Sequence, residues 1–397
     1  MAALSFLDAR SKVLSEVRAR RQTPPVEAVP LAAANGRVLA EDIPADRDYP
    51  PFDRSMRDGF AVRAADLPGT LHLIGEVRAG AVYTGAPGAP GQAVEIMTGA
   101  PVPAGFDAVV MVEHCERPQP SSIQTDRSLT SGANIARRGS EAPAGKIVAE
   151  RGHRIDYATV SLLATTGHAT VQVYTRPRVA ILATGDEIVP VNEQPAAHQI
   201  RNSNAWSLAA QVERAGGVPI ILPVAPDTRA ETRALIEQGL QEDLLLLSGG
   251  VSAGKYDVVE LALADLGAEF FFDRVLIQPG QPLVFGSARN KFFFGLPGNP
   301  GSTMVTFELF GRAAHDLLSG ATEAPLPLTF ARLAKPFRHK TGLTRFLPAN
   351  LSCLEITPVD WQGSGDVPAL SRANAFLVAD SEKGDYAAGD LIGVLLK

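Results

Sequence analysis

Apolar and polar positions follow three different rhythms along the chain. In residues 4–20 apolar residues recur every three or four positions, and Ser5 and Asp8 have the spacing of a capping box. This pattern predicts an amphipathic helix. The residues expected on its apolar side are Leu7, Leu14 and Val17. From about residue 27 to 140, short apolar runs such as LHLIGEV and AVVMVE are separated by Gly and Pro, which predicts a small, irregular β domain.

A different rhythm begins near residue 177. The apolar runs RVAILATG, VPIILPV, DLLLLSGG and KFFFGLPGNP have the length of strands, and each is followed by a helical pattern. Alternating strands and helices predict a parallel α/β sheet flanked by helices. Before it, GHRIDYATVSLLATTGHATVQVY reads as a helix followed by a strand, and after it the tail returns to short strands.

These patterns predict a multidomain α/β plus β protein with four domains. Residues 1–26 and 141–176 are expected to form a discontinuous α+β domain, and residues 27–140 an N-terminal β domain. Residues 177–325 are expected to form a central α/β domain. Residues 326–397 are expected to form a small C-terminal β domain.

Composition narrows the functional classes. The 397 residues are 45% hydrophobic and 20% charged with a net charge of −6, which is typical of a globular protein and offers no overall basic field for nucleic acid or an anionic membrane. The 2 cysteines and 7 histidines form no zinc or haem motif. We find neither an apolar stretch of roughly 18 residues nor a signal-peptide core. Because Asp8 and Glu16 argue against a mitochondrial presequence, we expect a cytoplasmic protein.

Candidate ligand-binding residues lie at the carboxyl ends of the predicted parallel strands, where ligands of open α/β sheets bind. They are Thr184, Gly185, Asp186 and Glu187; Asp227; Ser248, Gly249, Gly250, Val251 and Ser252, with Lys255 and Asp257 beyond; and Pro297, Gly298 and Asn299. Glycine-rich turns that lead into helices favour an anionic ligand. Carboxylates beside such a ligand fit best if Mg²⁺ bridges them to it, and the expected ligands are Glu187, Asp227 and Asp257.

Each of these residues, taken alone, also fits a structural role. Asp227 and Asp257 stand where helix N-caps occur, and Lys255 fits a solvated surface lysine. The run GGVSAGKY from Gly249 matches a triphosphate-binding loop except at Tyr256, where a Ser or Thr should hold magnesium. A P-loop NTPase is therefore disfavoured.

Seven segments together resemble the molybdopterin molybdenumtransferase family, called MoeA in bacteria and present as the E domain of gephyrin. In family order they are PPFD…S…DGFAV, MTGAPVPAGFDAVVMVE, ATGDEI, LSGGVSAGKYD, IQPGQPLVFG, FGLPGNPGS and LTRFLPA. The resemblance implies insertion of molybdate into adenylylated molybdopterin with release of AMP, and a homodimer whose active sites join one subunit's α/β domain to the other's N-terminal loops. It also implies that the central α/β domain, residues 177–325, is of the molybdopterin-binding type, and that the protein contacts the molybdopterin adenylyltransferase and molybdoenzymes.

The resemblance assigns roles to particular residues. The implied metal and catalytic residues are Glu187, Asp227 and Asp257, with Asp58 and Thr98 from the N-terminal loops. The implied substrate-binding residues are Ser248, Gly249, Gly250, Ser252, Pro297, Gly298 and Asn299, and on the molybdate side Ser302, Arg345, Ser371, Arg274, Gln278 and Gln281.

Two departures from the family pattern concern charge. Gln278 and Gln281 stand where family members often carry lysine, and glutamine donates hydrogen bonds without a charge. Arg274 and Arg345 are the cations that could compensate. The loop DRSMRDGF also contains Arg54 and Arg57, which either supply positive charge or pair with the aspartates of that loop.

Two other functions stay open on the sequence alone. One is a non-catalytic scaffold that binds molybdopterin, since gephyrin's E domain also docks receptor peptides. The other is the related adenylyltransferase, which the long regions on both sides of the α/β domain disfavour.

Overall fold

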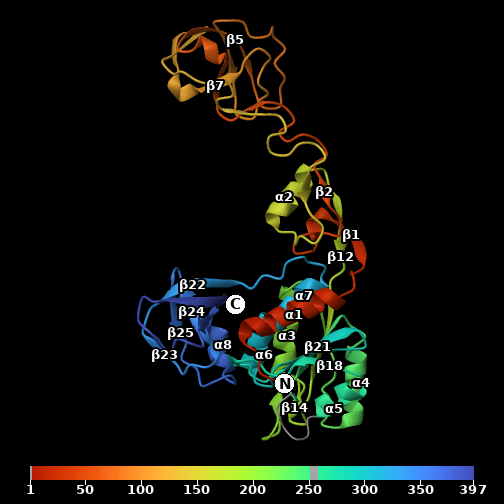
Figure 1. Cartoon of the computed structure of the whole chain (residues 1–397). Coiled ribbons are helices and arrows are strands. Elements are labelled where there is room, and N and C mark those ends of the chain that lie inside the picture. The colour runs from red at the N-terminus through yellow and green to blue at the C-terminus, as the bar shows by residue number, and fades with distance from the viewer. Residues whose placement is uncertain (1, 251–257) are drawn as a thin grey trace. The chain divides into compact units, whose positions relative to one another are not determined.

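The structure is a computed structural model that describes residues 2–250 and 258–397 (Figure 1). The chain divides into two compact units. The first, here called the large unit, comprises residues 1–40, 152–156 and 171–397. The second, the inserted unit, comprises residues 41–151 and 157–170.

A six-stranded sheet in the order β16-β13-β17-β21-β20-β18 organises the large unit. The first four strands are parallel, and β20 runs antiparallel to β21 because they are joined by a tight turn whose two residues, Arg289 and Asn290, have φ of 50° and 63°. The predicted fold class is confirmed, with this antiparallel edge as an addition. The strands are β13 (Arg178–Ala183), β16 (Val218–Ile221), β17 (Leu244–Ser248), β18 (Glu269–Phe272), β20 (Val284–Ala288) and β21 (Lys291–Leu296).

Strand β17 is buried on both faces of the sheet, which explains why it contains four leucines in a row. Leu244 and Leu246 belong to a hydrophobic core on one face of the sheet, and Leu245 and Leu247 to a core on the other face. Helices α1, α3, α6 and α7 pack on the first face, and α4 and α5 on the second. Their bounds are α1 (Phe6–Arg20), α3 (Ser203–Arg214), α4 (Arg229–Gly239), α5 (Val258–Asp265), α6 (Pro300–Thr306) and α7 (Arg312–Leu318).

The first predicted helix is confirmed as α1, with Ser5 as its N-cap accepting from the Asp8 N–H at 3.2 Å. Of the residues predicted on its apolar side, Val17 is buried and Leu14 packs against the same core, but Leu7 is 68% exposed and Phe6 is buried instead. Helices α6 and α7 are joined by one turn of π-helix, Phe307–Gly311, so that residues 300–318 form one continuous helical segment.

The C-terminal part of the large unit is a closed β-barrel. Its strands follow the order β24-β25-β22-β28-β26, and a further pairing between β26 and β24 closes the ring. The short strand β19 (Ile277–Gln278) adds to β24 in parallel. The elements of this part are β22 (Leu328–Leu333), β23 (Phe337–Arg338), β24 (Thr344–Ser352), β25 (Glu355–Pro358), α8 (Val367–Arg372), β26 (Ala375–Ala379), β27 (Asp385–Tyr386) and β28 (Leu391–Leu396). The remaining strands of the large unit pair two by two: β1 (Val26–Pro30) with β12 (Thr170–Tyr174), and β14 (Ile188–Val189) with β15 (Ile200–Arg201).

The inserted unit is built on a second six-stranded sheet, in the order β7-β4-β6-β5-β9-β8. Phe60 and Ile96, which are buried, contribute to its core. Its elements are β2 (Ile43–Pro44), β3 (Arg54–Ser55), β4 (Gly59–Val62), β5 (Gly69–Val77), β6 (Gln92–Ile96), β7 (Ala108–Met111), β8 (Glu116–Gln119), β9 (Ser122–Thr125), β10 (Ile135–Ala136), β11 (Ile147–Ala149) and α2 (Tyr157–Thr165). Across the described ranges, no helix is both long and apolar enough to span a bilayer.

Candidate active site

The carboxyl ends of three neighbouring parallel strands lie side by side in the large unit. Thr184 follows β13, and its N–H donates to the carbonyl of Ser248 at 3.2 Å. Gly249 follows β17, and its N–H donates to the carbonyl of Leu296 at 3.2 Å. The structure therefore brings together the predicted glycine turn after β17 and the predicted turn Pro297–Asn299 after β21.

The glycine turn requires residues without a side chain. Gly249 and Gly250 have φ of +94° and +64°, a region that side-chain-bearing residues rarely adopt. A Cβ added to Gly250 would lie 2.7 Å from the hydroxyl of Thr184 and 2.6 Å from Val259 Cγ2. The absence of side chains lets the turn lie directly against Thr184, whose buried hydroxyl has no hydrogen-bond partner among the described residues.

Asn204, in the first turn of α3, is a residue that the sequence reasoning missed. Its Nδ2 donates to Ser248 Oγ at 2.9 Å and to the carbonyl of Gly298 at 2.7 Å. Asn202 caps the helix by accepting from the Ala205 N–H. The sequence offered one signal, since two asparagines stand at the helix start and only one of them is needed as the cap.

Two of the three predicted magnesium ligands can be placed. Glu187 and Asp227 are both exposed, and the Asp227 N–H donates to Asp186 Oδ1 at 3.1 Å. The N-cap of α4 is Thr228, so the capping alternative for Asp227 is wrong. Asp257 lies outside the described residues, as does the predicted substrate-binding residue Ser252. Among the residues that are described, no group of three or more His, Cys, Asp or Glu side chains could hold a metal ion.

In the inserted unit, the structure brings Asp58 and Thr98 together. The backbone N–H of Thr98 donates to Asp58 Oδ1 at 2.7 Å and its hydroxyl donates to the same oxygen at 2.8 Å. These hydrogen bonds, the backbone one first, lower the pKa of the Asp58 carboxyl from its usual range. The pair is exposed, and its carboxylate is charged at neutral pH.

Arg54, in the same loop, pairs with a glutamate and not with an aspartate of that loop. Arg54 pairs with Glu141 at 2.7 Å, while Asp53 pairs with Arg137 at 2.6 Å. The pairing alternative for Arg54 is therefore wrong as stated, because its carboxylate partner comes from another loop.

On the predicted molybdate side, the structure brings Gln278 and Arg345 together as partners of the parallel β19–β24 pairing. The Nε of Arg345 is buried and has no hydrogen-bond partner within the described part of the chain. Arg274, Gln278 and Gln281 are exposed and Ser302 is buried. The exposed Ser371 donates its hydroxyl to the carbonyl of Pro368 at 2.9 Å, within its own helix.

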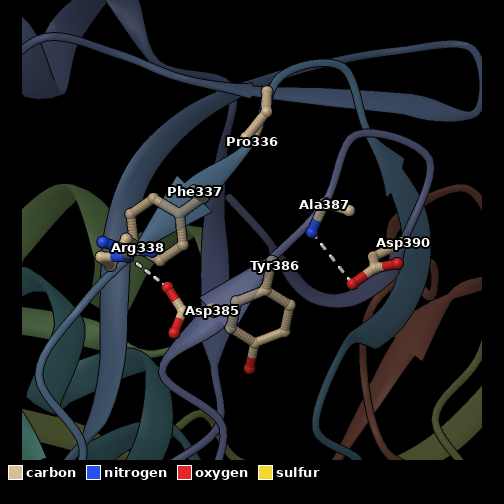
Figure 2. A pocket seen from close by; sticks show the side chains of 7 residues that line it. All are labelled: Pro336, Phe337, Arg338, Asp385, Tyr386, Ala387 and Asp390. Atoms are coloured by element: carbon tan, nitrogen blue, oxygen red, sulfur yellow. Dashed lines mark hydrogen bonds and ion pairs between the residues drawn. The ribbon is translucent and has the colours of Figure 1, made fainter.

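A cavity of about 510 Å³ lies elsewhere, beside β23 and β27 in the C-terminal part (Figure 2). Figure 2 shows Arg338 paired with Asp385, and the Ala387 N–H donating to Asp390. The lining residues are Pro336, Phe337, Arg338, Asp385, Tyr386, Ala387 and Asp390. None of them belongs to the predicted site, so this cavity does not locate the chemistry.

Comparisons with known proteins cover nearly the whole chain. Residues 4–167 match the MoeA N-terminal region (domain I and II), residues 180–316 a probable molybdopterin binding domain, and residues 331–397 the MoeA C-terminal region (domain IV). The chain is 37% identical to the molybdopterin molybdenumtransferase of Bacillus subtilis over 91% of this chain and 87% of that one. It is 33% identical to that of Haemophilus influenzae over 98% of each. The crystal structure of a molybdopterin biosynthesis MoeA protein from Pyrococcus horikoshii superposes with a TM-score of 0.80 at 28% identity, covering 100% of both chains.

Proposed function

Because this chain belongs to the molybdopterin molybdenumtransferase (MoeA) family, we propose that it is a transferase of molybdenum cofactor biosynthesis that acts on molybdopterin and molybdate. The observation that carries the proposal is similarity along the full length to relatives of that name, at 37% and 33% identity. No observation favours the alternative of a non-catalytic scaffold. The match to all three family regions also disfavours the adenylyltransferase, whose family usually consists of the α/β domain alone.

The proposed substrate is adenylylated molybdopterin, and the proposed products are molybdenum cofactor and AMP. In this reaction two thiol sulfurs of the pterin bond to molybdenum, and one oxo oxygen of molybdate leaves as water with the two thiol protons. Hydrolysis of the phosphoanhydride then releases AMP. A site for this chemistry has to hold a charged phosphate link, and backbone N–H groups of glycine turns at strand ends suit that task.

We assign Glu187, Asp227 and Asp257 as the ligands of Mg²⁺. Glu187 and Asp227 are exposed carboxylates that follow strands of the sheet, and carboxylates are the donor type that magnesium prefers, so these two residues fit the ion. When bound, the ion would neutralise charge on the phosphoanhydride and polarise it for attack. The glycine turn and the turn Pro297–Asn299 bind the substrate in this proposal.

We further propose a cytoplasmic homodimer in which the partner subunit contributes its Asp58–Thr98 pair to each site. The carboxylate of Asp58 is kept charged by two hydrogen bonds from Thr98, so it is suited to orient a cationic or proton-donating group. The division into four domains, and contacts with the adenylyltransferase and with molybdoenzymes, are parts of the same proposal.

The test is release of AMP from adenylylated molybdopterin by the purified protein. With Mg²⁺ present, we expect AMP release that depends on molybdate, and a product that activates a molybdenum-free molybdoenzyme. Tight binding of the pterin without any AMP release would instead support the scaffold. Consumption of ATP with unmodified molybdopterin would identify an adenylyltransferase. A titration with molybdate measures the concentration that is needed for AMP release. We expect Gln278 and Gln281 to make this concentration higher than lysines at the same positions would, because neutral donors bind an oxyanion more weakly than lysines.

A further inference from the structure

The two turns that are proposed to bind the substrate follow different strands. They can form one site only because they lie close to each other. The glycine turn follows β17, and the turn Pro297–Asn299 follows β21. They lie close to each other, since a Cβ added to Gly298 would be 3.8 Å from the Cα of Gly249. A side chain that bonds to the end of β17 and to the turn Pro297–Asn299 would therefore fix the distance between the two turns.

Asn204 is that side chain. Its Nδ2 donates to Ser248 Oγ, immediately before the glycine turn, and to the carbonyl of Gly298 in the other turn, at 2.9 and 2.7 Å. The carbonyl of Gly298 can only accept, which fixes the orientation of the amide with Nδ2 toward it. Both hydrogen bonds of one amino group are thus used to join the ends of two strands.

A second amide side chain, Gln211, forms hydrogen bonds further along the helix that contains Asn204. Gln211, two turns further along the same face of α3, donates to the carbonyl of Met304 at 3.1 Å and to Glu308 at 2.7 Å. Glu308 is 3% exposed and also pairs with Arg214 at 2.5 Å. Helix α3 therefore bonds to the polypeptide that follows β21 at two places, through Asn204 at the site and through Gln211 away from it.

We propose that Asn204 is a positioning residue of the molybdenum transfer reaction, one that sets the distance between the two substrate-binding turns. This proposal rests on the proposed function, because it assumes that both turns contact adenylylated molybdopterin. It gives Asn204 no direct role in the chemical step.

Gln211 provides a matched control, because it is an amide on the same helix face that also donates two hydrogen bonds but touches neither turn. Asn204→Ala and Gln211→Ala should both lower the melting temperature. In the absence of molybdate, we expect the Kd of adenylylated molybdopterin to rise about 10-fold in Asn204→Ala, which corresponds to the loss of about one net hydrogen bond. In Gln211→Ala the Kd should change less than about twofold. Equal weakening in both variants, or none in Asn204→Ala, would overturn the proposal.

A second measurement does not depend on the substrate. In the ligand-free protein, amide hydrogen exchange at Gly249, whose N–H donates to the carbonyl of Leu296, should be faster in Asn204→Ala than in the parent and unchanged in Gln211→Ala. If the parent protein fails to bind adenylylated molybdopterin, the proposed function is wrong, while the exchange result still decides whether Asn204 holds the turns. Should Asn204→Ala fail to fold, Asn204→Asp keeps the size of the side chain and places an oxygen against the Gly298 carbonyl. The same two readouts then apply, and unchanged exchange in that variant counts against the proposal.

Discussion

Asp58 and Thr98 form a pair whose hydrogen bonds control the charge of a single carboxyl. Both donors of Thr98, the backbone N–H and the hydroxyl, point at the same Asp58 oxygen. A carboxylate that accepts hydrogen bonds is stabilised in its charged form, so its pKa falls. The backbone donor remains in any substitution of Thr98, whereas the hydroxyl donor can be removed.

We expect Thr98→Val to raise the pKa of Asp58 toward its ordinary value. In the parent, the lowered pKa means that these hydrogen bonds stabilise the folded state above the unfolded pKa of about 3.9, and that this stabilisation is lost as pH falls through the folded pKa. In the variant the loss should occur at a higher pH. NMR titration of the Asp58 carboxyl measures this, and Thr98→Ser is the control that should leave the pKa as in the parent. A valine variant with an unchanged titration would show that the hydroxyl has no part in the shift.

Thr184 presents the opposite situation, a polar group without a partner. The residue is 6% exposed and its hydroxyl is buried against the glycine turn, unpaired within residues 2–250 and 258–397. Burying an unpaired hydroxyl costs about 1–3 kcal/mol. We therefore expect Thr184→Val, which keeps the shape of the side chain, to raise the free energy of unfolding by about 1 kcal/mol. Urea denaturation measures the change, and a loss of stability would mean that the hydroxyl is hydrogen-bonded in solution.

Among the helices, α1 shows what the sequence could and could not predict. The Ser5–Asp8 capping box located its start, because capping depends on neighbouring residues alone. Val17 is buried as predicted, and Phe6 packs against Phe310 and Phe346 with ring centroids 6.0 and 5.4 Å apart. In the first turn, however, Leu7 was predicted to face the core, and Phe6 takes that place. Both residues are apolar, and only distant partners decide which one faces inward.

The same helix contributes a buried cation to the π-helical turn. Arg10 is 8% exposed and donates to the carbonyls of Leu309 and Ala324 at 2.5 and 2.6 Å. A π-turn leaves the ordinary helical hydrogen-bond register, and Arg10 gives the carbonyl of Leu309 a partner from outside the helix. Burial lowers the pKa of this guanidinium, which nevertheless stays charged.

We expect Arg10→Met to lower the free energy of unfolding by about 3 kcal/mol, because two hydrogen bonds from a buried charged donor are lost. Arg18→Met, on an exposed position of the same helix, is the control and should change stability by less than about 0.5 kcal/mol. Chemical denaturation of the two variants compares them. Equal small effects would show that water replaces Arg10 at the carbonyls.

For the chain as a whole, local sequence signals predicted the α/β alternation, and the ordered family motifs predicted the function. The sequence patterns did not predict the antiparallel strand β20 or the closure of the C-terminal barrel by the β24–β26 pairing, since both depend on which distant strands meet. For the candidate site, the sequence pattern identified Glu187 and Asp227, because both carboxylates follow predicted strands. Asn204 was missed because its role is visible only when Ser248 and Gly298, which are far apart in the sequence, lie beside it.

The proposed dimer makes a prediction about mixed subunits. If each site combines Glu187 of one subunit with Asp58 of the other, Asp58→Ala and Glu187→Ala should each be inactive alone. Random reassociation of the two variants gives hybrid dimers in half of the molecules, and each hybrid contains one intact and one doubly altered site. We therefore expect about a quarter of the parent's AMP release after mixing. Gel filtration confirms that dimers form, and an inactive mixture of such dimers would place both residues in sites built within one subunit.

The path of the chain between the two units limits how the protein can be shortened. The polypeptide leaves the large unit after Ala40, returns for residues 152–156, and comes back finally at Val171. The Ala40 N–H donates to the carbonyl of Gln172 at 2.9 Å, so residues 40 and 171 could be spliced by a short linker. Such a splice would also discard Arg154, which pairs at 2.9 Å with the buried Asp316. In an excised large unit Asp316 would keep only Arg312, at 3.5 Å, as an arginine partner, and grafting residues 152–156 back would restore the shorter pair with Arg154.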